Sequence, residues 1–344
     1  MTPLVSILIP SYNAEAWIAD TIKSALDQTW PRKEIVIVDD GSTDETVAVA
    51  RRFASAQVKV VTQENQGAAA ARNRALELYQ GDYIQWLDAD DLLAPDKIET
   101  QIKALERCAS KRTLISGAWA YFRYRVSKAE PQPSSLWRDL FPVEWLIHKM
   151  QEGVHMQTDN WLVSRELTEA AGPWDVRLFR DNDGEYFCRV LIASDGTCFV
   201  REARSYYRTA GFNSISYIGR NNKKLDSLFI SMQLHLKYLL SLEDSPRTRQ
   251  ACLMYLDIWS PEFYPHRTDI IEKLQAMSSE LGGELRPRIP WKYACLQRVF
   301  GWSLARRAQL LLPRIKDSVA ISLDRTLFRL ESKRTAKDRA AMSW

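Results

Sequence analysis

The chain has 344 residues and a net charge of +4, with 46% hydrophobic and 26% charged residues. This length and composition fit a globular protein of one large domain with an extension, or of two domains. No apolar run approaches the ~18 residues that cross a bilayer, and no basic segment precedes the first apolar run, so we expect neither a membrane span nor a secretory signal. Five cysteines without metal-like spacing indicate reduced thiols in a cytoplasmic protein.

The first 110 residues alternate between strand-like and helix-like patterns. Apolar runs predict strands at residues 5–9, 34–38, 58–61 and 83–87, and helical periodicity marks residues 14–28, 44–53 and 67–78. Strands that alternate with helices are typical of a parallel sheet covered on both faces. The predicted fold class is therefore α/β, with a doubly wound, mostly parallel, Rossmann-like sheet.

The rest of the chain divides into a mixed region and a helical region. Further strands are predicted at residues 113–124, 161–163 and 197–208, with a helix over residues 183–193. From residue 225 onward the pattern is helical. We expect a sheet domain over residues 1–218, with halves 1–110 and 111–218, and a helical C-terminal extension over residues 219–344.

Three polar clusters follow the carboxyl ends of predicted strands. They are Pro10-Ser11-Tyr12-Asn13, Asp39-Asp40-Gly41-Ser42 and Asp88-Ala89-Asp90-Asp91. In doubly wound sheets, ligands bind in the crevice beyond these strand ends. The three loops can therefore converge on one ligand.

The third cluster places three carboxylates directly after a buried strand, where they repel one another unless positive charge lies between them. Hard divalent cations such as Mg²⁺ take oxygen ligands from carboxylates and from substrate phosphates. We therefore predict a metal–diphosphate site at residues 88–91. A helix cap would explain Asp91 alone. The second cluster, taken by itself, also suits a simple turn, because Asp, Gly and Ser are common turn formers.

These clusters, with Gly67 and the segment Ala71-Arg72-Asn73, occur in the order and at the spacing of one enzyme family. Over residues 4–215 the chain resembles the family 2 glycosyltransferases, which have a GT-A type fold, use nucleotide-diphosphate sugars and invert the anomeric centre. The resemblance implies a nucleotide-binding half over residues 1–110 and an acceptor half over residues 111–218. It also implies a divalent metal cofactor, Mg²⁺ or Mn²⁺.

The resemblance gives the first two clusters a role in nucleotide binding. Tyr12 would stack on the base, and the main chain near Pro10 would line the base pocket. Asp40, or alternatively Asp39, would accept the N3 hydrogen of uracil in a charge-assisted hydrogen bond. Gly67 would begin a helix that faces the same crevice.

The remaining donor-side roles fall on the third cluster and its neighbours. Asp88, next to Ala89, would hold the ribose hydroxyls, and Asp90 would bind the metal that bridges both phosphates. Other donor-side candidates are Arg72 and Asn73, which would shape the nucleotide pocket or support the Asp88 loop, and Arg208, which would contact the diphosphate. An exposed strand arginine is the alternative for Arg208.

Sugar transfer also needs a base to deprotonate the acceptor hydroxyl. The family carries an arginine six residues after its catalytic aspartate, and counting back from Arg189 assigns that role to Asp183. Asn182 stands where the family commonly has Glu, so Asp181 and Glu185 stay open as alternatives. A simple helix cap is the alternative role for Asp183.

The acceptor side is implied by Gly172-Pro173-Trp174-Asp175, which resembles the family's Gly-Gly-Phe-Asp loop. Acceptor-side candidates are Trp174, Asp175, Asp181 and Glu185. The favoured function is an inverting transfer of a sugar, from a UDP-sugar in particular, to a saccharide or lipid-linked hydroxyl in cell-surface polysaccharide synthesis. The alternatives are a non-catalytic nucleotide-sugar-binding or membrane scaffold and a sugar-nucleotide pyrophosphorylase, which would normally open with a Gly-rich loop.

The C-terminal region is basic. Residues 286–344 hold 14 Lys and Arg against 4 Asp and Glu, whereas residues 1–285 hold 33 against 39. Basic residues interleave with aromatic ones over residues 291–316, the composition of a helix on an anionic membrane surface. A helix packed on the protein body with a solvated basic face is the alternative. We expect a cytoplasmic protein, peripheral at the inner face of the membrane in the first case, and no nucleic-acid partner.

Overall fold

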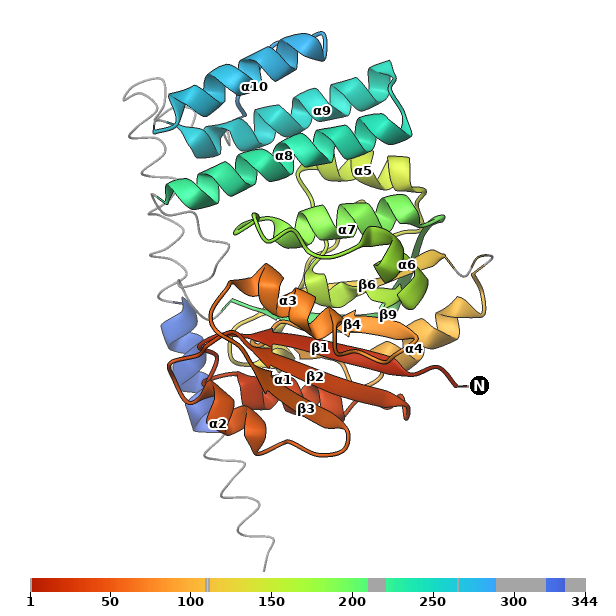
Figure 1. Ribbon diagram of the computed structural model, residues 1–344, viewed down its shortest axis with the longest axis vertical. Helices are drawn as coiled ribbons and strands as arrows, with labels where there is room; N and C mark the ends of the chain where they lie inside the picture. Colours follow the sequence, from red (N-terminus) through yellow and green to blue (C-terminus); the bar gives the residue numbers. More distant parts are fainter. Residues whose placement is uncertain are drawn as a thin grey trace, which may run out of the picture.

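The computed structural model describes residues 2–108, 110, 112–209, 221–264, 266–288 and 320–331. A nine-stranded sheet with its covering helices forms the lower part of the molecule in Figure 1, and a stack of helices lies above it. Within the described residues, no helix is both long enough and apolar enough to cross a membrane.

A parallel unit of four strands begins the chain. Its strands are β1 (Val5–Ser11), β2 (Lys33–Asp39), β3 (Val58–Thr62) and β4 (Tyr83–Trp86), in the spatial order β3-β2-β1-β4, and the helices between them are α1 (Ile18–Leu26), α2 (Thr46–Arg51) and α3 (Ala68–Leu76). Every residue of β1 is buried because helices cover both of its faces. Ile7 and Ile9 pack in the core that contains α1, and Leu8 packs in the core that contains α3. The predicted strand–helix alternation is confirmed.

Strands from the middle of the chain extend this sheet beyond β4. They are β8 (Leu162–Ser164), β6 (Thr113–Phe122), β9 (Gly196–Arg208) and β5 (Leu92–Leu93), added in that order, with β7 (Glu130–Pro131) paired to β6. β8 is antiparallel to both β4 and β6, β6 is parallel to β9, and β5 is antiparallel to β9. The sheet is therefore mixed and is parallel at its first end, which confirms the α/β class.

The remaining helices pack against the sheet or in the stack above it. They are α4 (Lys97–Leu105), η1 (Val126–Lys128), α5 (Pro142–Glu152), η2 (Thr158–Asn160), α6 (Arg165–Ala171), α7 (Asn182–Ala193), α8 (Asn222–Leu242), α9 (Pro246–Trp259), η3 (Ser260–Phe263) and α10 (Thr268–Glu280). One hydrophobic cluster contains Trp86 of β4, Tyr186 of α7, Met232 of α8 and Leu256 of α9. Helices α8 and α9 therefore share a continuous core with the sheet.

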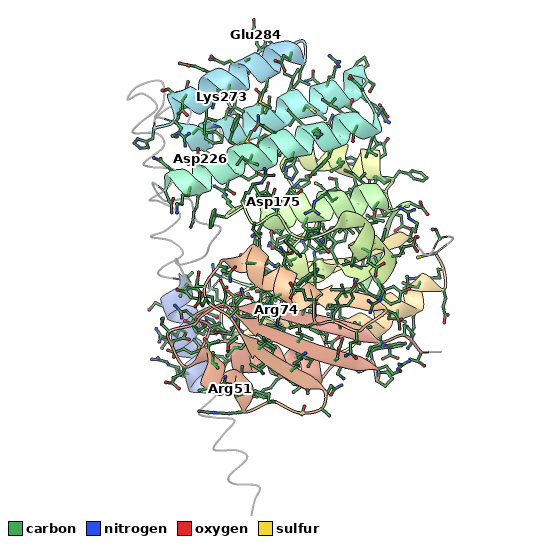
Figure 2. The ribbon with its side chains drawn as sticks, viewed as in Figure 1. Arg51, Arg74, Asp175, Asp226, Lys273 and Glu284 are labelled. Atoms are coloured by element: carbon green, nitrogen blue, oxygen red, sulfur yellow. The ribbon has the colours of Figure 1, made fainter. Side chains whose placement is uncertain are left out.

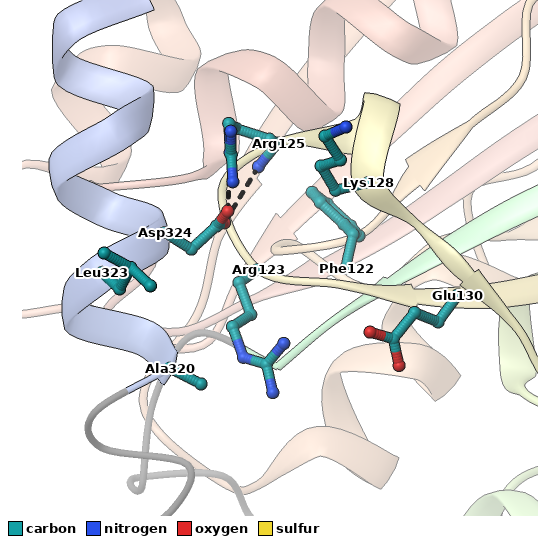
Figure 3. Close-up of a pocket in the computed structure, with 8 residues that line it drawn as sticks. All are labelled: Phe122, Arg123, Arg125, Lys128, Glu130, Ala320, Leu323 and Asp324. Atoms are coloured by element: carbon teal, nitrogen blue, oxygen red, sulfur yellow. Dashed lines mark hydrogen bonds and ion pairs between the residues drawn. The ribbon is translucent and has the colours of Figure 1, made fainter.

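A further helix, residues 320–331, lies beside the strand ends at the left of Figure 1. The Asp324 carboxylate accepts hydrogen bonds from the Tyr124 backbone N–H at 2.9 Å and from Arg125 Nε at 2.7 Å, and Figure 3 shows the ion pair. The ring centroids of Phe328 and Tyr124 are 6.0 Å apart. This helix is therefore fastened to the loop that follows β6. The basic and aromatic segment 291–316 lies outside the described residues.

The carboxyl ends of the parallel strands meet at one edge of the sheet. Ser11 at the end of β1 pairs in register with Asp39 at the end of β2. The Asp40 N–H donates to the Ser11 carbonyl at 2.8 Å, and the Gln63 N–H donates to the Asp39 carbonyl at 2.9 Å. The predicted convergence of the first two polar clusters is confirmed by these bonds.

Candidate active site

Asp40 organises the loop that leads into α3. Its Oδ1 accepts from Gln63 Nε2 at 2.8 Å and from the Gln66 N–H at 2.9 Å, and its Oδ2 accepts from the Gly67 N–H at 2.7 Å. Gly67 has φ +94°, a conformation that a residue with a Cβ adopts only under strain. Each carboxylate oxygen has two lone pairs. Oδ2, which accepts one of these three bonds, therefore has a lone pair left for a further donor.

Asp39 and Tyr12, which belong to the first two strand-end clusters, have different environments. Asp39 is buried and closes the turn after β2, because its Oδ2 accepts from the Ser42 N–H at 2.9 Å. Tyr12 follows Pro10 and Ser11 at the end of β1, and its side chain is 50% exposed. An exposed aromatic ring at the carboxyl edge of a parallel sheet is a suitable platform for a flat base.

Arg72 joins the two sides of the candidate site. Its Nη2 donates to Asp88 Oδ1 at 2.8 Å, and its Nη1 donates to Asn182 Oδ1 at 3.3 Å. The guanidinium carbon lies 4.5 Å from the centroid of the Trp174 ring. One buried guanidinium on α3 therefore contacts the acidic loop after β4, the first residue of α7 and the Trp174 loop.

Asn73 fixes the same Trp174 loop through the backbone. Its Nδ2 donates to the Trp174 carbonyl at 2.9 Å, and its Oδ1 accepts from the Trp174 N–H at 2.7 Å. The Trp174 ring is buried and stacks on Tyr186 at 4.0 Å. Trp174 therefore supports Arg72 and α7, and its ring does not reach the surface where an acceptor would bind.

The carboxylates of the acidic loop are not equivalent. Asp91 is buried, and its Oδ1 accepts from the Arg208 backbone N–H at 2.7 Å. The Thr21 hydroxyl contacts the carbonyl oxygens of both Ala89 and Asp91, at 3.0 and 2.9 Å. These bonds fix the loop. Of its three carboxylates, those of Asp88 and Asp90 remain open to solvent.

The open carboxylates suit a divalent cation that is also held by substrate. Asp90 is exposed, yet desolvation by the surrounding protein, with the Asp88 charge, raises its pKa to about 6. Within the described residues, no group of three or more His, Cys, Asp and Glu side chains is placed to hold a metal alone. Mg²⁺ commonly binds through one or two carboxylates plus substrate phosphates, which is the set that Asp88 and Asp90 offer.

Arg208 supports this loop from its buried side. It is buried, with its guanidinium carbon 4.3 Å from the Trp17 ring and 4.4 Å from the Phe122 ring. Its Nε donates to the Asp90 carbonyl at 2.7 Å. Burial lowers the pKa of Arg208, and the charge of Asp20 opposes the shift. The alternative of an exposed strand arginine is therefore wrong.

Asp183 lies in the first turn of α7 and is half-buried. Burial raises the pKa of Asp183, the Asp181 and Asp88 charges raise it further, and Arg72 opposes the shift. A carboxylate with a raised pKa is a stronger proton acceptor than an ordinary one. Asp181 stands at the N-cap position of α7, without a side-chain capping bond, and Asp183 is the second residue of the helix, so Asp183 is not its N-cap residue.

The other acidic candidates on this side have protein partners. Glu185 is buried, pairs with Arg189 through both oxygens at 2.7 and 2.8 Å, and accepts from the Tyr238 hydroxyl at 2.6 Å. Asp175, labelled in Figure 2 between α8 and the sheet, is paired with Arg177 at 2.6 Å. The hydrogen bond from Arg177 lowers the pKa of Asp175.

Sequence reasoning missed several residues of the site. Trp17 packs on Arg208, although its position looked like an ordinary apolar helix face. Val176 and Phe179 are exposed on the segment that leads to Asp181. In the sequence, Val176 and Phe179 lie between the Trp174 motif and the predicted base, and this position could have marked them as candidates for the site. The contact of His235 with Asp181, 3.6 Å between Nδ1 and Oδ2, had no local signal at all.

The chain is similar to known proteins over this region. The family model described as "Glycosyl transferase family 2" matches residues 6–169. TuaG of Bacillus subtilis, named as a teichuronic acid biosynthesis glycosyltransferase, is 47% identical over 104 residues, which are 29% of this chain and 41% of TuaG. EpsH of Bacillus subtilis, named as a glycosyltransferase, is 39% identical over 232 residues, 65% of each chain.

The fold is similar to that of a solved enzyme. S. aureus TarS 1–349 in complex with UDP-GlcNAc superposes with a TM-score of 0.64 at 16% sequence identity, over 81% of this chain and 80% of that one. This likeness confirms the predicted GT-A type fold with a helical C-terminal region. With the family model and the relatives, it leads to one conclusion: this chain is similar to glycosyl transferase family 2, whose model matches residues 6–169.

Proposed function

We propose that the protein transfers a sugar from a nucleoside-diphosphate donor to an acceptor hydroxyl, with inversion at the anomeric carbon. The observation that carries this proposal is the double contact of Arg72 with Asp88 and Asn182. It joins the open carboxylates of the acidic loop to the turn that bears Asp183. The match of residues 6–169 to the family model and the UDP-GlcNAc complex of the TarS neighbour support the same reading.

The donor would bind along the carboxyl edge of the parallel strands. The exposed Tyr12 ring would stack on the base, and the free lone pair of Asp40 would accept an imide N–H, which favours uracil. Asp88 would accept from the ribose hydroxyls while Arg72 holds it in place. We therefore propose a UDP-sugar as the donor.

The diphosphate would lie at the acidic loop. Asp90, with Asp88 beside it, would hold Mg²⁺ or Mn²⁺, and such an ion supplies charge neutralisation for a leaving diphosphate. Arg208 acts on this loop from within the protein, because it fixes the Asp90 carbonyl rather than presenting a free surface charge.

Asp183 would act as the general base. The acceptor oxygen attacks the anomeric carbon as Asp183 takes its proton, and the bond from that carbon to the phosphate oxygen breaks, which releases the nucleoside diphosphate. Base catalysis needs the carboxylate form, so activity would be present above the raised pKa of Asp183 and lost as the pH falls through it.

The acceptor would be a saccharide or lipid-linked hydroxyl of a cell-surface polysaccharide, as the name of TuaG suggests for that relative. A panel of UDP- and GDP-sugars with Mn²⁺, assayed for donor hydrolysis and for transfer to simple glycosides, tests the proposal. Turnover of one donor is the expected result. Binding without turnover for every donor and acceptor would favour the non-catalytic alternative.

We also propose that the C-terminal region contacts an anionic membrane. Helix 320–331 is fastened through Asp324 on one face, while Leu323 and Leu330 are 60% and 59% exposed near Arg325 and Arg329. Exposed apolar and basic side chains on one helix favour anionic interfaces. Co-sedimentation with phosphatidylglycerol vesicles, but not with phosphatidylcholine vesicles, is the expected result, and equal binding to both would count against it.

A further inference from the structure

The segment that precedes the proposed base is enclosed by the helical extension. The Ser227 hydroxyl of α8 contacts both the N–H and the carbonyl of Arg180, each at 2.9 Å. An ion pair of 3.4 Å joins Arg180 to Glu262 of η3. The backbone three residues before Asp183 is therefore held by elements that follow the sheet domain in the chain.

Asp181 holds an unusual conformation at the start of α7. Its φ is +56°, a left-handed conformation that is uncommon for residues with a Cβ, although aspartate adopts it more readily than most. A Cβ added to Gly184 would lie 2.0 Å from Asp181 Oδ1. The Asp181 carboxylate therefore folds over the first turn of α7, and only glycine leaves room for it.

His235 of α8 supports this carboxylate from the other side. It is fully buried, and its Nδ1 lies 3.6 Å from Asp181 Oδ2 and 2.8 Å from the Tyr255 hydroxyl of α9. Burial lowers the pKa of His235 to about 4. The imidazole is therefore neutral near pH 7. It contacts Asp181 as an uncharged polar group and not as a cation.

A second contact acts one turn further along α7. The Tyr238 hydroxyl, on the next turn of α8 after His235, donates to Glu185 Oε1 at 2.6 Å, and Glu185 also pairs with Arg189. Helix α8 therefore touches α7 at the residue before its start and again at its fourth residue. Asp183 lies between these two points.

We infer that α8 and α9 belong to the catalytic machinery and that His235 is a positioning residue for Asp183. Tyr255 holds His235, His235 contacts the Asp181 carboxylate, and Asp181 in turn sets the first turn of α7, from which the base projects. This inference rests on the proposed function, because it concerns the base of that reaction. It gives the helical extension a role in catalysis, in addition to the roles of the strand-end motifs.

Two substitutions at position 235 test the role. His235→Asn keeps an amide nitrogen near the place of Nδ1, whereas His235→Leu removes the polar contact. We expect His235→Leu to lower the kcat of transfer by about tenfold to a hundredfold, as small misplacements of catalytic groups do, with the donor KM within about twofold of wild type. His235→Asn should recover most of the rate. Ser278→Ala is the control, because it removes a buried hydroxyl of α10 that donates to the Leu274 carbonyl.

Hydrogen exchange gives a readout that does not need turnover. Amides of residues 182–186 should exchange faster in His235→Leu than in wild type or in Ser278→Ala. If wild type turns over no donor, the proposed function fails, and this exchange result still decides whether His235 positions the turn. Equal exchange and equal kcat in His235→Leu and wild type would overturn the inference.

Tyr255→Phe covers the case in which His235→Leu does not fold. It removes one hydroxyl, and the same two readouts should change in the same direction. Unchanged kcat and unchanged exchange in a folded Tyr255→Phe protein would also overturn the inference. Equal losses of donor affinity and of kcat would also overturn the inference, because they would indicate general damage to the site and not misplacement of the base.

Discussion

Arg72 donates from Nη2 to Asp88 Oδ1 across 2.8 Å, and this bond connects the helix after β3 to the acidic loop after β4. The same guanidinium also lies over Trp174. A planar cation that forks between two acceptors and stacks on an indole cannot be replaced by a lysine ammonium without loss.

Arg72→Lys should therefore lower kcat/KM by about a hundredfold, because Asp88 and the turn of Asp183 lose their shared partner. Steady-state kinetics with a UDP-sugar would measure this. Arg74→Lys is the matched control, since Arg74 lies on the same helix, is exposed and pairs with Glu77. Wild-type kinetics in Arg72→Lys would show that the two sides of the site are not coupled through this residue.

Asp90→Asn should remove the dependence of UDP binding on Mn²⁺. The amide keeps the size of the side chain but loses the charge that a hard cation requires. Calorimetric titration of UDP with and without Mn²⁺ would compare the two proteins. Asp96→Asn, which removes a charge from an exposed residue nearby, should behave as wild type. An Asp90→Asn protein that still binds UDP more tightly with Mn²⁺ would place the metal elsewhere.

The pH dependence of kcat should report Asp183. Its pKa is raised by burial and then by the Asp181 charge, so the acidic limb of the profile lies above the usual aspartate range. Asp181→Asn removes one raising charge, and the limb should move to lower pH. The profile is measured at saturating donor and Mn²⁺, with Asp175→Asn as the control. A limb that stays in place would assign the base to another group.

Arg208→Met should destabilise the protein by about 3 kcal/mol, because two carbonyls lose a buried donor. These are the carbonyls of Asp90 and Arg123. Methionine also removes the guanidinium that lies over the Trp17 and Phe122 rings, so the loss reports these contacts together with the hydrogen bonds. Urea unfolding would measure it. A change under about 0.5 kcal/mol, the usual range for surface residues, would show that the acidic loop holds its shape without Arg208.

The parallel half and its strand-end motifs were predictable because each strand is an apolar run that ends in polar residues. The start of α1 was placed too early, at residue 14, because residues 14–17 form a turn, in which the Trp17 and Ile18 N–H groups both bond the Ala14 carbonyl, before the helix begins at Ile18. The strand β5 has two residues, which is too short to show a period. The support of Asp181 by His235 depends on how α8 packs, and no local pattern carries that information.

Asp324→Ala should release helix 320–331 while the sheet domain stays folded. The carboxylate accepts from two backbone N–H groups and pairs with Arg125, and losing these bonds should cost about 1–3 kcal/mol locally. Faster hydrogen exchange confined to residues 320–331 is the expected result, with donor affinity unchanged. Arg325→Ala, on the exposed side of the same helix, should leave exchange as in wild type. If Asp324→Ala instead weakens UDP binding, the helix acts on the donor site through Tyr124, whose ring lies 5.4 Å from that of Trp17.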